Sequence, residues 1–86
     1  MVKVDKEFLI EQVIDFIDER LIITDNENDY ILTSDVFYFL NEKRDYENLI
    51  LRHDINKAFV RKKINKKIFK GTMNFVGVYW KPTKVI

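Results

Sequence analysis

The chain of 86 residues contains no cysteine, one proline, two glycines and one histidine. Without cysteine there is no disulfide framework, no thiolate zinc site and no cysteine nucleophile. Small secreted domains usually need disulfides, so we expect an intracellular protein. Because Gly71 and Gly77 are the only glycines and no Gly-Lys-Ser/Thr sequence occurs, a phosphate-binding loop of the nucleotide-hydrolysing type is excluded.

Long apolar runs are also absent, since no uninterrupted stretch approaches the roughly 20 residues that span a bilayer. Acidic residues appear at Asp5 and Glu7, before any apolar segment begins, which is not the pattern of a targeting signal. Apolar residues still make up 47% of the chain, enough for a core, and the length allows only one compact domain. We expect a single soluble domain over residues 1–86 that does not enter a membrane.

Charge is divided unevenly along the chain. Residues 1–50 carry five basic and thirteen acidic side chains, a net charge of −8, whereas residues 51–86 carry ten and one, a net charge of +9. The overall charge of +1 therefore hides two oppositely charged halves. At short range a polyanion is attracted by the C-terminal half and repelled by the N-terminal half.

Hydrophobic periodicity predicts a helix at the N-terminal end. Apolar residues recur at helical spacing from about Asp5 to Leu21 and leave an acidic face for solvent. A brief β-branched strand is expected at residues 22–24. The Asp- and Asn-rich segment 25–29 that follows favours a turn, because these short side chains compete for backbone hydrogen bonds.

Two further helices are expected in the middle of the chain. Thr33 or Ser34 is the predicted N-cap of the first, which ends near Lys43 and Arg44. The other extends from about His53 to Ile64 and differs between its two faces. The predicted buried face carries Ile55, Ala58 and Phe59, and the opposite face carries Lys57, Val60, Arg61 and Ile64.

The C-terminal segment has the shorter period of strands. Residues 67–70 and 75–80 are expected to form two strands, joined by a turn over residues 71–74 and stopped by Pro82. The order helix, strand, helix, helix, strand, turn, strand is that of an α+β winged helix-turn-helix. In that architecture the third helix can enter a major groove while the hairpin contacts the neighbouring backbone.

Basic side chains are concentrated on those two elements, with eight within nineteen residues from Arg52 to Lys70. The predicted nucleic-acid-binding residues are Asn56, Lys57, Arg61, Lys63, Lys66, Lys67 and Lys70. Asn56 and Arg61 are the candidates for directed contacts with bases. The lysines behave as point charges, so they are expected to bind phosphates with strongly salt-dependent affinity.

Other chemistries find less support in the sequence. Asp25, Glu27 and Asp29 alternate like the start of a calcium loop, but Tyr30 and Val36 stand where that loop needs glycine and glutamate. The single His53 makes a poor metal site, and the carboxylates of the first helix imply no cleft. We therefore expect no metal, no cofactor and no catalytic activity. Trp80 and the seven phenylalanines are assigned to the core.

Several segments resemble a known module. They are Phe16-Ile17-Asp18-Glu19-Arg20, Tyr30-Ile31-Leu32-Thr33-Ser34-Asp35-Val36-Phe37-Tyr38-Phe39, Asp54-Ile55-Asn56-Lys57-Ala58-Phe59 and Gly77-Val78-Tyr79-Trp80-Lys81. Together, roughly from Val13 to Lys81, they resemble the winged-helix domain at the C-terminal end of poxvirus-type primase-helicases of large DNA viruses and some phages. The resemblance implies a winged-helix fold and a role beside DNA in viral or mobile-element replication, in the host cytoplasm or nucleus. It does not imply ATP hydrolysis.

Three functions remain open at this point. The leading hypothesis is a small non-enzymatic protein that binds double-stranded DNA through the third helix and the hairpin. The alternative is a protein-interaction adaptor, or a self-assembling one, that uses the acidic face of the first helix. A third interpretation, binding of single-stranded RNA or DNA by stacking, needs Phe75, Tyr79 or Trp80 to be exposed.

Overall fold

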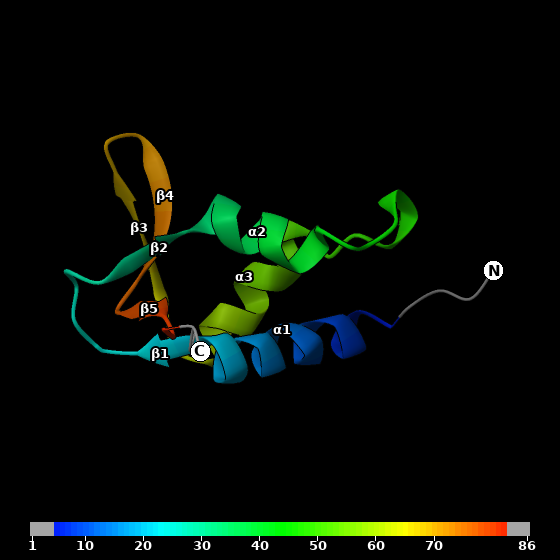
Figure 1. The fold of residues 1–86 in the computed structure, drawn as a ribbon, viewed down its shortest axis with the longest axis horizontal. Coiled ribbons are helices and arrows are strands. Elements are labelled where there is room, and N and C mark those ends of the chain that lie inside the picture. The colour runs from blue at the N-terminus through cyan, green and yellow to red at the C-terminus, as the bar shows by residue number, and fades with distance from the viewer. Residues whose placement is uncertain (1–4, 83–86) are drawn as a thin grey trace.

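The computed structural model describes residues 5–82, which form an α+β fold of helices and short antiparallel strands (Figure 1). The helices are α1 (Lys6–Arg20), α2 (Thr33–Asn41) and α3 (Arg52–Arg61), with a 3-10 turn at Tyr46–Asn48. The strands are β1 (Leu21–Ile23), β2 (Tyr30–Leu32), β3 (Asn65–Phe69), β4 (Thr72–Val76) and β5 (Val78–Trp80).

The strands form two small antiparallel sheets. One has the order β2-β4-β3, so that β4 is central and β3 is an edge strand, and the other consists of β1 and β5. The β3–β4 hairpin projects from the end of the molecule where α2 begins (Figure 1). This hairpin and α3 are therefore neighbours in space as well as in sequence.

The N-terminal helix agrees with the prediction in its position and in its faces. The carboxylate of Asp5 caps α1 by accepting a hydrogen bond of 3.0 Å from the Glu7 N–H. Val13 and Ile17 are buried on the predicted apolar stripe. The acidic side chains predicted for solvent, Glu11, Asp15, Asp18 and Glu19, are exposed.

The start of α2 differs from the prediction. The sequence pattern predicts no element at residues 30–32, but they pair with β4. The chain is therefore still extended at Leu32, the residue before the helix. Thr33 is the first helical residue and not the N-cap, and Ser34 lies inside the helix. The Thr33 hydroxyl instead donates to the carbonyl oxygen of Met73 at 3.3 Å, which joins α2 to the hairpin.

The end of α2 lies at Asn41, short of the predicted Lys43 and Arg44. The buried Asn41 amide donates to the carbonyl oxygens of Phe37 and Ile50, both at 3.0 Å. Its side-chain oxygen accepts from the Ile50 N–H at 2.7 Å. These bonds hold the approach to α3 against the end of α2.

The end of α3 corrects the prediction for Ile64. The helix ends at Arg61, and the N–H groups of Lys63 and Ile64 donate to the carbonyl oxygens of Val60 and Phe59, both at 2.9 Å. This is the Schellman arrangement, and Lys63 takes the left-handed position with φ +59°. It turns Ile64 back into the core, where the side chain is buried, whereas Val60 stays exposed on the outer face of α3.

The C-terminal strands also differ from the prediction. Lys70 and Gly71 alone form the turn, so residues 72–74 belong to β4, and the strand predicted over residues 75–80 is divided at Gly77. Gly77 has φ +73°, and its carbonyl oxygen accepts hydrogen bonds from the Thr24 and Asp25 N–H groups at 2.8 and 3.1 Å. Because the chain bends there, β5 leaves the first sheet and pairs with β1.

The core contains residues from all three helices and both sheets. Its buried apolar members are Leu9, Ile10, Val13, Phe16, Ile17, Leu21, Ile31, Val36, Ile50, Ile55, Ala58, Phe59, Ile64, Phe75 and Val78. Trp80 packs against this core while half-buried. The assignment of every phenylalanine to the core is wrong for Phe8 and Phe39, whose side chains are 53% and 43% exposed.

Candidate nucleic-acid interface

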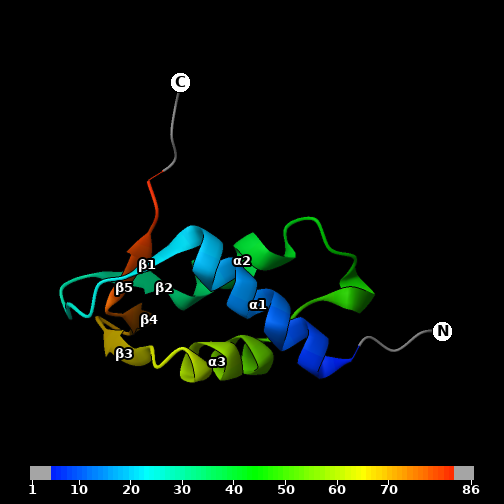
Figure 2. The same cartoon turned by 90° about the horizontal axis from the view of Figure 1, so that it is seen from below.

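One face of α3 packs on the core and the opposite face meets solvent. Ile55, Ala58 and Phe59 are buried, whereas Lys57 and Val60 are exposed, as the helical period requires. Figure 2 shows α3 and β3 along the same side of the molecule. The solvent-facing side of α3 is therefore continuous with the hairpin.

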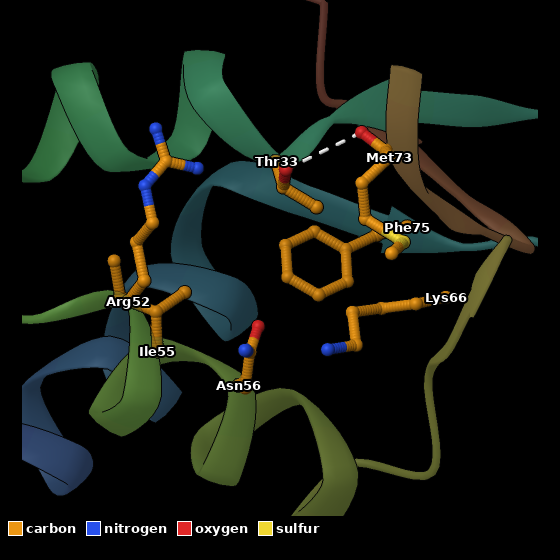
Figure 3. Close-up of a pocket in the computed structure, with 7 residues that line it drawn as sticks. All are labelled: Thr33, Arg52, Ile55, Asn56, Lys66, Met73 and Phe75. Carbon is orange, nitrogen blue, oxygen red and sulfur yellow. Dashed lines mark hydrogen bonds between the residues drawn. The ribbon is translucent and has the colours of Figure 1, made fainter. Parts of the chain in front are cut away.

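A hollow of about 200 Å³ lies where α3, the hairpin and the start of α2 meet (Figure 3). It is lined by Thr33, Arg52, Ile55, Asn56, Lys66, Met73 and Phe75. The buried side chains of Ile55 and Phe75 make part of this lining apolar. The remaining polar groups are a guanidinium, an amide, an amine and a hydroxyl, so no carboxylate opposes an incoming anion inside the hollow.

Lys66 and Asn56 come together across this hollow. In the β3–β4 register Lys66 lies opposite Phe75, and directly opposed residues share one face of a sheet. The Lys66 side chain is therefore on the side of the hairpin that faces α3. Figure 3 shows its amino group directed toward Asn56. The structure thus joins one predicted residue of the helix with one of the hairpin.

Arg52 is the functional candidate that sequence reasoning missed. It belongs to the basic cluster from Arg52 to Lys70 but is not among the seven predicted binding residues. Its guanidinium lies 4.8 Å from the centre of the Phe37 ring, a cation–π contact that positions it between α3 and α2 (Figure 3). Residues four apart share one side of a helix, so the spacing of Arg52 and Asn56 is the signal that could have found it.

A stacked aromatic pair fixes the helix relative to the hairpin. The rings of Phe59 and Phe75 lie 3.7 Å apart with an interplanar angle of 8°, and both side chains are fully buried. Phe59 is on α3 and Phe75 is on the central strand of the sheet. The stack therefore preorganises the hollow, because its two walls cannot move apart without breaking this contact.

Lys67 and Lys70 lie outside the hollow. Side chains alternate along a strand, so Lys67 points to the opposite face of the hairpin from Lys66. Its amino group lies 5.4 Å from the centre of the Phe69 ring. Lys70 is at the turn of the hairpin, with φ +50° beside Gly71.

Acidic side chains of α1 engage two cations at the end of α3. Both terminal nitrogens of Arg61 donate to the Glu7 carboxylate, at 2.7 and 2.9 Å. The Lys62 amino group lies 2.6 Å from Asp18 Oδ1. The hydrogen bond with Arg61 lowers the pKa of Glu7 and raises the pKa of Arg61. Arg61, a predicted base contact, is thus directed toward α1 and away from the hollow.

The remaining predicted residues are Lys57 and Lys63. Lys57 is exposed next to Asn56 on the outer face of α3. Lys63 lies beyond the end of the helix and lines a separate hollow with Asp25 and Glu27 of the β1–β2 loop. Of the seven predicted residues, Asn56 and Lys66 therefore gather at the first hollow. Lys57 lies on the same side of α3 as Arg61, where its charge acts on Glu7, and Lys63 faces acidic groups.

The aromatic residues needed for base stacking are not equally accessible. Phe75 is fully buried beneath Phe59, and Trp80 is half-buried. Tyr79 is 54% exposed, but it lies on β5, in the other sheet from Lys66. Phe75 is therefore unable to stack on a base in this structure, and Tyr79 is separated from the basic hollow.

Comparisons with known proteins assign no family to this chain. Neither the protein-family models nor the curated proteins nor the solved structures include a match to the chain. Among residues 5–82, no helix has the length and apolar character needed to cross a membrane. The function of the hollow is therefore inferred from its own side chains.

Proposed function

We propose that this chain is a small non-enzymatic DNA-binding protein of the winged-helix type. In this proposal the outer face of α3 lies against the duplex, and the β3–β4 hairpin, as the wing, contacts the neighbouring backbone. The element order and the addition of β2 to the hairpin sheet support this assignment. The resemblance to the C-terminal domain of poxvirus-type primase-helicases supports a role in viral or mobile-element replication.

The observation that carries the proposal is the convergence of Arg52, Asn56 and Lys66 on one hollow. Two cations and an amide donor at one site match the acceptor oxygens of a phosphate. The lining residues include no histidine and no carboxylate, so Lys66 has no second acid–base group to act with there. Binding without chemistry is the function that this arrangement favours.

Phosphate contacts are expected to outweigh base contacts. Asn56 is the one residue of the hollow with an amide suited to an adenine edge. Arginine is the commonest reader of guanine, but Arg61 is held by Glu7 and Arg52 is held over Phe37. We therefore propose weak sequence preference and binding dominated by the duplex backbone.

A salt-dependent titration tests this function. A labelled duplex of about 16 base pairs is titrated with the protein at 20 to 200 mM salt, beside single-stranded DNA and RNA of the same length. If Arg52, Lys57 and Lys66 each neutralise one phosphate, log K falls with log salt at a slope of about −3. Absence of duplex binding at 20 mM salt would refute the proposal, and tighter binding to a single strand would favour the stacking alternative.

A further inference from the structure

A second surface, on the side of α1 and α2, combines carboxylates with aromatic rings, of which those of Tyr38 and Phe39 are exposed. It consists of Asp15, Phe16 and Glu19 on α1, Asp35, Tyr38, Phe39 and Glu42 on α2, and Trp80 on β5, and is called the acidic aromatic surface below. The Phe39 ring centre lies 5.3 Å from that of Phe16 and 5.7 Å from that of Trp80. Although it contacts both rings, Phe39 is 43% exposed.

Phe39 separates two open hollows on this surface. The hollow on the Trp80 side has a volume of about 520 Å³ and the hollow on the Phe16 side about 320 Å³. Four carboxylates border them, whereas the single cation there, Arg20, lies 5.5 Å from the centre of the Phe39 ring. Aromatic faces bordered by carboxylates suit a ligand that carries both apolar groups and amines.

The chain itself presents such a ligand on the hairpin. Register and alternation place Tyr30, Lys67 and Phe69 on the face of the sheet turned away from α3. The Tyr30 and Phe69 rings are 5.4 Å apart, and the Lys67 amino group is 5.4 Å from the Phe69 ring. Tyr30 and Lys67 are exposed and Phe69 is half-buried. This hairpin back face is thus basic and aromatic.

We propose that copies of this chain associate head to tail, with the hairpin back face of one copy on the acidic aromatic surface of the next. The charges and the aromatic character of the two surfaces are complementary, and each lies on a different part of the molecule. Such a contact is heterologous, so it leaves one unused surface at each end and can extend into a chain or close into a ring.

The contact is independent of the proposed DNA interface. Lys66 and Lys67 are neighbours in sequence but lie on opposite faces of β3. A copy whose Lys67 face is covered by its neighbour therefore keeps the Lys66 face and α3 free for DNA. Because the charged side chains of both surfaces are exposed, we expect a weak, salt-sensitive association with a Kd on the order of 10–100 µM.

Two charge-reversal variants test the association in the absence of DNA. Lys67→Glu alters only the hairpin back face, and the double variant Glu19→Lys/Glu42→Lys alters only the acidic aromatic surface; all three side chains are exposed. Sedimentation velocity is measured from 10 to 500 µM at 20 mM and 300 mM salt. Circular dichroism checks that each variant is folded. The matched control is Lys66→Glu, on the other face of the same strand.

We expect the wild type and Lys66→Glu to associate at 20 mM salt and to dissociate at 300 mM salt. Each of the two test variants should remain monomeric by itself. Their equimolar mixture should associate, because each hairpin back face then meets a surface of opposite charge on the other variant. Combining all three reversals in one chain should restore self-association.

Three results would overturn the proposal. The first is a wild type that stays monomeric at 500 µM and 20 mM salt. The second is a mixture of the two test variants that forms no complex while the wild type associates. The third is Lys66→Glu abolishing association as completely as Lys67→Glu. Because no DNA is present, these results are separate from success or failure of the proposed DNA binding.

Discussion

The Arg61 guanidinium and the Glu7 carboxylate form a two-point ion pair, with N···O distances of 2.7 and 2.9 Å, that links the basic end of α3 to the acidic α1. The N-terminal half therefore does more than repel a polyanion at a distance. It engages a specific cation of the C-terminal half. Lys62, next in the chain, forms a single-contact ion pair with Asp18, also on α1.

Removal of the Glu7 charge should strengthen DNA binding. In Glu7→Gln the Arg61 guanidinium loses its ionic partner and becomes able to contact a phosphate. We expect duplex affinity at 50 mM salt to rise about three- to tenfold and the salt slope to steepen by about one. Asp15→Asn removes an α1 charge that has no partner on α3 and is the matched control, with a smaller gain. Equal gains for both variants would show that only net charge matters.

The same pair predicts how stability depends on pH. The pKa of Glu7 in the folded protein is lowered by its hydrogen bond to Arg61, relative to a usual value of 4.5. A lowered folded-state pKa contributes stability that is present above pH 4.5 and is lost as the pH falls through the folded pKa. The melting temperatures of the wild type and Glu7→Gln should thus differ at pH 7 and converge in acid. A difference that is unchanged from pH 7 to pH 3 would contradict this.

Truncation of the stacked aromatic pair should destabilise the fold strongly. Phe59→Ala removes a fully buried ring in contact with Phe75, and we expect a loss of about 3–5 kcal/mol in the free energy of unfolding by urea. Phe59→Leu keeps most of the volume and should cost about 1 kcal/mol. If both substitutions cost less than this smaller amount, the stack would not be what holds α3 to the hairpin.

Loss of the buried Asn41 amide should lower the free energy of unfolding. In Asn41→Ala the buried Ile50 N–H loses its acceptor, and an unsatisfied buried donor costs about 1–3 kcal/mol. Asn48→Ala, in the same linker, changes an exposed side chain and should remain within about 0.5 kcal/mol of the wild type. Urea unfolding of the two variants checks this, and equal stabilities would contradict it.

Features that depend on local periodicity could be predicted from the sequence. The helix from Asp5 to Leu21 and the buried face of α3 follow from apolar spacing alone. The left-handed turn at Lys63 that buries Ile64 could not be predicted in this way, because lysine has no intrinsic preference for that conformation. The division of the last strand at Gly77 likewise depends on bonds to a loop about fifty residues earlier, a separation that no local pattern reports.

The candidate site was predictable in composition but not in arrangement. Charge counting located the basic elements and included both Lys66 and Lys67. Which of them faces α3 depends on strand register, and that is set by the pairing of β3 with β4 and by the burial of Phe75. Arg61 is not available at the site because it pairs with Glu7. That pairing depends on how α1 packs on α3, which no local pattern in either helix specifies.

The comparison of Lys66→Gln with Lys67→Gln tests the central claim most directly, since it separates the face of the hairpin beside α3 from basic charge in general. Affinity for a 16-base-pair duplex is measured at 50 mM salt and at protein concentrations below 1 µM. We predict that Lys66→Gln weakens binding about three- to tenfold and lowers the salt slope by about one, while Lys67→Gln stays within about twofold of the wild type. Equal losses for the two variants would contradict the account.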